Sequence, residues 1–86
     1  MSYIVNEKVV SKSIDGEAFL LNLKSGEYFG LNSTGALIWQ AIESGQAEEE
    51  IVNSLVEKYQ ANKDEIIEDL QALVRELKSE QILLDE

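Results

Sequence analysis

The chain has 86 residues, of which 44% are hydrophobic and 28% charged, so it has the length and composition of one small globular domain spanning residues 1–86. It contains no cysteine and no histidine, which excludes disulfides, thiolate metal sites, cysteine nucleophiles and histidine bases. With seventeen acidic and seven basic residues its net charge is -10, which makes nucleic acid and anionic membranes unfavourable partners.

The N-terminal third of the chain predicts three short β-strands in an antiparallel meander. Residues 8–14 form a β-prone run that ends at Asp15-Gly16, a dipeptide typical of hairpin turns. The second strand covers residues 17–23, and a glycine-containing turn separates it from the third strand, Tyr28–Leu31. Both faces of the second strand carry hydrophobic residues, because Phe19, Leu21 and Leu23 alternate with Ala18, Leu20 and Asn22.

After Asn32 the pattern changes from strands to helices. Asn32 has the side chain of a helix N-cap, and the first helix is predicted from about Ser33 to Glu43. The second helix is expected over residues 47–59, with glutamates in its first turn where the helix dipole favours negative charge. The third is expected over residues 63–80. The order of three strands and three helices predicts an α+β fold of winged-helix-like type, a three-stranded antiparallel sheet followed by three helices.

The third helix, opened by Asn62 or Asp64, carries two hydrophobic stripes. The main stripe is Ile66, Leu70, Leu73 and Leu77, with Ile67 and Val74 one position round. One stripe is enough to hold the helix on its core, so the second either widens the hydrophobic face toward a groove or marks a deeply buried helix. The closing residues 82–84 are expected to pack back as a short hydrophobic tail or strand.

No group of residues predicts catalysis, a cofactor or a metal site. The serines and threonines have no histidine to activate them, and the glycines do not form a phosphate-binding loop. Trp39 is expected to fill the core, and Glu48–Glu50 to be a solvated helix start. The N-terminus has no signal-peptide pattern, and no stretch approaches the ~20 apolar residues of a membrane span, so we expect a cytoplasmic protein.

The edge of the third strand is the first candidate binding site. A three-stranded meander leaves two edges, and extended peptides bind such edges by adding a strand. Gly30 either lets a neighbouring backbone approach this edge or relieves packing beside the first helix, and the residues alone favour the second explanation.

The ordered motifs of the chain resemble those of the PqqD-like family. The resemblance begins at Leu-Asn-Leu-Lys-Ser-Gly-Glu-Tyr-Phe-Gly-Leu-Asn, residues 21–32, and continues through Thr34–Trp39. Further matches are residues 51–55 before Tyr59, residues 69–73 before Leu77, and the closing Gln81-Ile82-Leu83. It covers about residues 8–84. The chain departs from the family at Gln81, where a glycine is frequent, and this affects the C-terminal turn only.

The resemblance implies a non-enzymatic domain that recognises the leader segment of a ribosomally synthesised precursor peptide. In such domains the leader adds as a strand to the third β-strand and lies against the third helix. The implied backbone contacts are Glu27, Tyr28, Phe29, Gly30 and Leu31, and the side-chain contacts chosen on the third helix are Ile67, Leu70, Gln71, Val74 and Lys78. The acidic surface favours a basic leader or a basic enzyme partner.

Three functions remain open from the sequence. The Tyr-Phe-Gly-Leu-Asn block and the length most resemble the separate leader-binding proteins of lasso-peptide clusters, whose partner is a leader peptidase on its own chain. A peptide chaperone of PQQ biosynthesis, serving another modifying enzyme, is the alternative within the family. A winged-helix DNA-binding or oligomerisation module is the alternative outside it, although the second helix is too acidic for a recognition helix.

Overall fold

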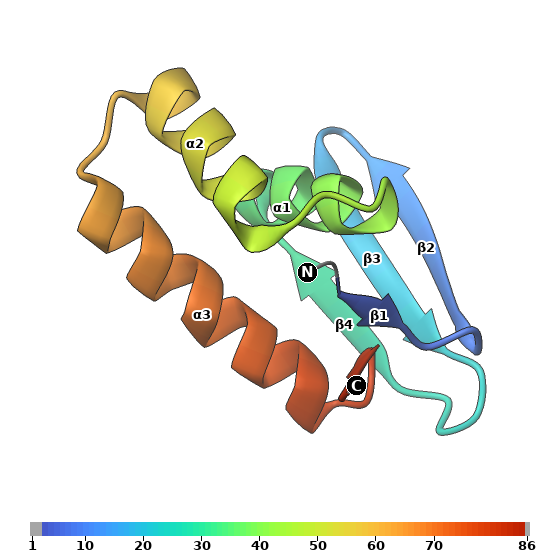
Figure 1. Ribbon diagram of the computed structural model, residues 1–86. Coiled ribbons are helices and arrows are strands. Elements are labelled where there is room, and N and C mark those ends of the chain that lie inside the picture. The colour runs from blue at the N-terminus through green and yellow to red at the C-terminus, as the bar shows by residue number, and fades with distance from the viewer. Residues whose placement is uncertain (1–2, 86) are drawn as a thin grey trace.

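The structure, a computed structural model, describes residues 3–85 and consists of a three-stranded antiparallel sheet, three helices and a small two-stranded ladder. Figure 1 shows α1 lying across the sheet and α3 running alongside β4. The elements in chain order are β1 (Ile4–Val5), β2 (Val9–Ile14), β3 (Glu17–Asn22), β4 (Tyr28–Leu31), α1 (Ser33–Glu43), α2 (Glu48–Tyr59), α3 (Lys63–Ser79) and β5 (Leu83–Leu84). The predicted α+β, winged-helix-like order is confirmed, and the predicted third strand is β4.

Two tight hairpins join β2, β3 and β4. Asp15 and Gly16 both have positive φ, 52° and 81°, which is the backbone of the turn that this dipeptide predicts. The second hairpin depends on Asn22, which is 5% exposed and whose Oδ1 accepts from the backbone N–H groups of Lys24 (2.9 Å) and Ser25 (3.2 Å). This buried amide therefore positions β4 relative to β3.

The inner face of the sheet is the face that carries Ala18, Leu20 and Asn22, all of which are buried. The alternate residues of β3 face outward, and Phe19 remains 39% exposed. α1 packs on the inner face and brings Trp39, 2% exposed, into the core, as predicted. The alternation of residues in the sequence separates the two faces of β3 but does not say which one is buried. In the structure the face with the smaller side chains is buried, because α1 packs closely against that face.

The ends of the helices agree with the sequence to within one residue. Asn32 caps α1 with a bond from the Gly35 N–H to its Oδ1 (2.9 Å), and Asn62 caps α3 through Asp64 (2.8 Å). The capping of these helices is thus encoded by single side chains that accept otherwise unpaired N–H groups. α2 begins one residue later than predicted, at Glu48, and α3 ends one residue earlier, at Ser79.

The two ends of the chain meet in a short antiparallel ladder that joins β1 to β5. Ile4 pairs with Leu84 and Val5 with Leu83, and the Asn6 N–H donates to the Ile82 carbonyl (2.9 Å). The expectation that the closing hydrophobic residues pack back is confirmed, since Leu83 is 1% exposed. Their partner strand β1 was not predicted, because a two-residue strand has too little pattern to recognise.

Candidate functional site

β4 has one paired edge and one open edge. It pairs with β3 on one side, and no other strand within residues 3–85 pairs with it. The Asn22 N–H donates to the Glu27 carbonyl (3.0 Å), so the backbone groups of Glu27 point toward β3. In an antiparallel ladder, residues whose backbone groups point toward the partner strand alternate with residues whose backbone groups point away from it. Phe29 and Leu31 therefore direct their backbone groups to β3. Tyr28 and Gly30 direct theirs to the open edge, where each presents one donor and one acceptor.

A groove of about 450 Å³ lies between this edge, the start of α1 and α3. Its walls are residues of three elements: Phe29, Gly30 and Leu31 of β4, Asn32, Thr34, Gly35 and Ile38 around the start of α1, and Asp69, Leu73 and Glu76 of α3. Leu31 and Ile38 are buried and make part of its hydrophobic floor, while Leu73 is half-buried. The groove thus offers hydrophobic contacts directly beside unpaired backbone groups.

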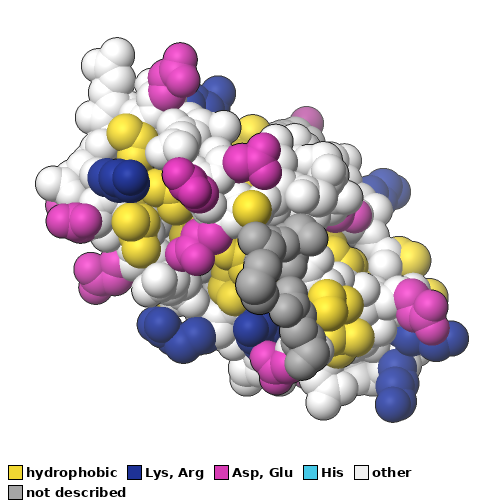
Figure 2. All heavy atoms as spheres, viewed as in Figure 1, with side chains coloured by type: hydrophobic (Ala, Val, Ile, Leu, Met, Phe, Trp, Pro, Cys, Tyr) yellow, Lys and Arg dark blue, Asp and Glu magenta, His cyan; other side chains and the backbone are white. Residues whose placement is uncertain are grey.

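The charges around the groove are negative. Asp69 and Glu76 line it, and none of its ten lining residues is basic. The ion pair found among residues 3–85 joins Lys78 to Asp85 (3.2 Å), so neither groove carboxylate is neutralised by a partner within the described chain. Figure 2 shows acidic side chains dispersed over the helical part of one face, with hydrophobic side chains between them.

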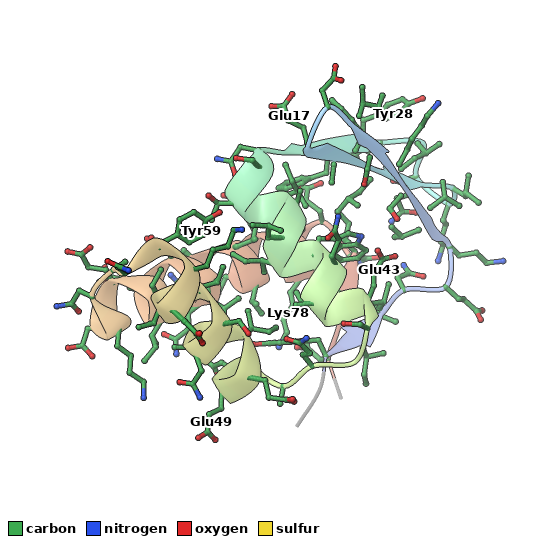
Figure 3. All side chains as sticks on the ribbon, turned by 90° about the horizontal axis from the view of Figure 1, so that it is seen from above. Glu17, Tyr28, Glu43, Glu49, Tyr59 and Lys78 are labelled. Atoms are coloured by element: carbon green, nitrogen blue, oxygen red, sulfur yellow. The ribbon has the colours of Figure 1, made fainter. Side chains whose placement is uncertain are left out.

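The predicted strand residues occupy three different positions at the site. Glu27 precedes β4, and its carbonyl accepts the hairpin bond from the Asn22 N–H. Phe29 and Leu31 direct their side chains inward, while Tyr28 is 75% exposed. Figure 3 shows Tyr28 on the side of the sheet away from the helices. The backbone of Tyr28 and Gly30, rather than the whole segment, is therefore available to a partner strand.

Gly30 does not relieve packing beside α1. A Cβ added at Gly30 would meet only the Phe19 ring, at 3.7 Å, which is an ordinary contact on the outer face of the sheet. Its φ is not in the left-handed region. The explanation that the residues alone favoured is thus wrong, and Gly30 leaves this position of the edge strand without a side chain.

The five helix residues predicted to face the groove lie elsewhere. Leu70 and Val74 are core residues, 0% and 9% exposed. Ile67 lines a separate hollow against α2, Gln71 Nε2 donates to Glu48 Oε1 (3.4 Å), and Lys78 pairs with Asp85. None of the five is among the residues that line the groove.

The face of α3 toward the groove is instead the one that carries Asp69, Leu73 and Glu76. These residues are four and three positions apart, so they lie in one row along the helix. Leu73 had been assigned to the main buried stripe and Val74 to the second one; in the structure Val74 is buried and Leu73 is half-exposed. The sequence did contain a signal for this groove-facing side of α3: Leu73 is the single hydrophobic residue in an otherwise acidic row along the helix.

Two further hollows lie outside the groove. One of about 320 Å³ lies between α1 and α2, with Leu37, Ile51 and Leu55 among its lining residues. The other, about 470 Å³, lies over the outer face of the sheet. Within residues 3–85 no three His, Cys, Asp or Glu side chains are grouped to hold a metal ion, and none of the described helices is long and apolar enough to cross a membrane.

Comparison with known families agrees with this architecture. The family model described as coenzyme PQQ synthesis protein D (PqqD) matches residues 17–83. The chain belongs to the PqqD family. The matched segment of this PqqD-family chain begins with β3 and includes β4, all three helices and the start of β5.

Two solved structures share the fold over nearly the whole chain. TbiB1 in complex with the TbiA(beta) leader peptide has a TM-score of 0.92 and 35% identity, over 96% of both chains. Lasso peptide synthetase B1 complexed with the leader peptide has a TM-score of 0.91 and 28% identity, over 99% of this chain and 100% of that one. No match is found among curated proteins.

Proposed function

We propose that this PqqD-family protein binds the leader segment of a ribosomally synthesised precursor peptide, without catalysing a reaction itself. The observation that carries the proposal is the open edge of β4 beside the groove to α3. Support comes from the two similar solved structures, both of which are complexes with leader peptides.

The leader would bind as a fourth strand of the β2–β3–β4 sheet. The outward backbone groups of Tyr28 and Gly30 would form the new ladder, and every second leader side chain would enter the groove. A disordered leader loses conformational freedom on binding, so affinity requires both the backbone bonds and hydrophobic anchoring against residues such as Leu31, Ile38 and Leu73. In this binding mode the leader would not contact the predicted helix residues, whose side chains are buried or engaged elsewhere: Ile67, Leu70, Gln71, Val74 and Lys78.

We further propose that the bound leader is passed to a separate enzyme, with a lasso-peptide leader peptidase as the first candidate. The likeness to a lasso peptide synthetase component supports this choice. The absence of cysteine and histidine from the sequence supports a division of labour in which the partner carries the chemistry. Because the precursor is made by ribosomes, the proposed place of action is the cytoplasm.

Amide hydrogen exchange tests the binding mode at single residues. The probe is a synthetic peptide with the sequence of the TbiA(beta) leader, which is bound in the similar TbiB1 structure. Binding should slow exchange at the Tyr28 and Gly30 N–H groups. The Phe29 and Leu31 N–H groups, already directed to β3, serve as internal controls that change less. Slowed exchange confined to the β2 edge, or no binding, would contradict the proposal.

A proline pair distinguishes the two edges of the sheet. Gly30→Pro removes an outward N–H while leaving the bonds to β3, and should weaken leader binding about tenfold, because one leader carbonyl loses its donor. Ser13→Pro makes the same change on β2. The Leu23 N–H donates to the Lys8 carbonyl, and counting the alternation from that bond shows that the Ser13 N–H also points away from β3. Ser13→Pro should leave binding unchanged. Fluorescence polarisation with labelled leader measures both.

A further inference from the structure

The row of α3 that faces the groove contains one hydrophobic residue among acidic ones. Asp69, Leu73 and Glu76 line the groove, and the helical repeat places Glu65 and Glu80 on the same row beyond them. The basic residues of the helix, Lys63, Arg75 and Lys78, fall on its other faces by the same repeat. The wall that a peptide would meet therefore presents one hydrophobic side chain flanked by two carboxylates.

The spacing of this wall matches an extended peptide. Asp69 and Glu76 are seven residues apart, about 10 Å along the helix axis at ~1.5 Å per residue. Inward side chains of a strand recur about every 6.7 Å, so three successive ones span about 13 Å. Long side chains at the outer two positions can close the difference of about 3 Å. Because α3 runs alongside β4, the row follows a strand added to that edge (Figure 1).

The chemistry of the wall selects among peptides. A lysine or arginine beside Asp69 or Glu76 would neutralise a carboxylate that has no ion-pair partner within residues 3–85. An acidic residue there would lie against like charge, which is unfavourable. The middle position faces Leu73 and the hydrophobic floor of Leu31 and Ile38, where an apolar side chain fits.

We propose that the groove selects leaders with the pattern basic–x–apolar–x–basic. The basic residues pair with Asp69 and Glu76, and the apolar one packs on Leu73. This inference rests on the proposed function and adds the chemical class of leader that the site accepts. The pattern reads the same in both directions, so it holds for either orientation of the added strand.

Selection from a displayed library of random 12-residue peptides tests the pattern. The wild-type protein should enrich Lys or Arg at two positions four apart, with an apolar residue between them. The D69N/E76Q variant should lose the basic preference and keep the apolar one. The E57Q/E68Q variant removes two charges outside the groove, so it should select the same peptides as the wild type.

Affinities of single peptides give the second readout. For one selected peptide, replacing both basic residues by glutamate should weaken binding to the wild type about tenfold or more. The difference should largely disappear for D69N/E76Q, while E57Q/E68Q should retain it.

The outcomes separate this inference from the proposed function. Peptides that slow exchange at Tyr28 and Gly30 but show no basic preference would overturn the inference and leave leader binding standing. A basic preference equally lost in E57Q/E68Q would also overturn it, because the effect would then reflect net charge. If the selected peptides leave the β4 edge unprotected, the inference fails as well, while the exchange experiment with the leader itself decides the proposed function.

Discussion

Gly30 and Gly35 lie five residues apart, one on β4 and one in the first turn of α1, and their surroundings differ. A Cβ at Gly35 would come within 3.2 Å of Leu31 Cβ and 3.3 Å of Leu31 Cδ2, which is too close without movement of the strand. A Cβ at Gly30 would make only ordinary contact with Phe19. At the scale of the single residue, the absence of a side chain at Gly35 lets α1 approach β4 closely, whereas Gly30 has no comparable close neighbour.

Alanine substitutions should separate these two roles. Gly35→Ala should destabilise the protein by about 1 kcal/mol, since overpacking of about 2 kcal/mol exceeds the gain of about 1 kcal/mol in helix propensity. Gly30→Ala should leave stability unchanged or raise it by up to about 1 kcal/mol, because glycine weakens a strand. Urea unfolding followed by circular dichroism measures both. A Gly35→Ala variant as stable as the wild type would show that β4 yields easily.

At the scale of the element, the end of α3 is a turn that would favour glycine but contains Gln81. Gln81 has φ 58°, its N–H donates to the Lys78 carbonyl (3.0 Å), and the Ile82 N–H donates to the Leu77 carbonyl (2.8 Å). These two bonds form a helix-ending motif whose left-handed position is usually glycine. A residue with a side chain at this left-handed position thus places strain in the turn that leads into β5.

Gln81→Gly should therefore stabilise the protein by about 1 kcal/mol, by relieving the positive φ of a residue with a side chain. The neighbouring Glu80→Gly is the matched control, because Glu80 has φ −86° and gains nothing from glycine. It should lower stability by about 0.5–1 kcal/mol. The midpoints of urea unfolding at constant slope report both effects, and a lower midpoint for Gln81→Gly would contradict the argument.

The face that a helix presents is also decided at this scale. The hydrophobic repeat of α3 identified Ile66, Leu70 and Leu77 as buried, and all three are. It placed Leu73 rather than Val74 in the main buried stripe, which is wrong, because the two positions are consecutive and the repeat alone does not separate them. The packing of α3 against the rest of the fold buries Val74 and leaves Leu73 in the groove.

At the scale of the whole molecule, the net charge of -10 opposes the compact state. One ion pair, between two exposed side chains, is found among residues 3–85, so little of this repulsion is compensated by direct pairing. The repulsion does not prevent folding, because the carboxylates lie at the surface, where water and salt screen them.

Salt should therefore raise thermal stability. Increasing NaCl from 0.01 to 0.2 M shortens the screening length from about 30 Å to less than 10 Å, and Tm should rise by about 5 °C for about 1 kcal/mol of relieved repulsion. KCl should act equally, and an uncharged osmolyte of the same osmolarity provides the control. A Tm that falls with added NaCl would mean that attractive ion pairs outweigh the repulsion. Differential scanning calorimetry gives the measurement.

The sequence by itself determined the order of the elements, the helix ends and the turns. These depend on neighbours in the chain: Asn32 and Asn62 accept N–H groups two or three residues away, and Asp15-Gly16 adopts the positive φ of its turn without help from elsewhere. It also identified the β4 segment as a candidate edge, because the alternation and length of the strands leave an edge open in any such meander.

Only the tertiary structure decided which groups form the site. The backbone groups of Tyr28 and Gly30 face outward because of the ladder register, and Asp69, Leu73 and Glu76 reach the groove because α3 runs alongside β4. The β1–β5 ladder likewise joins residues some eighty positions apart. Such relations arise from packing between distant segments, and a periodic pattern in one segment carries no information about the direction of its partner.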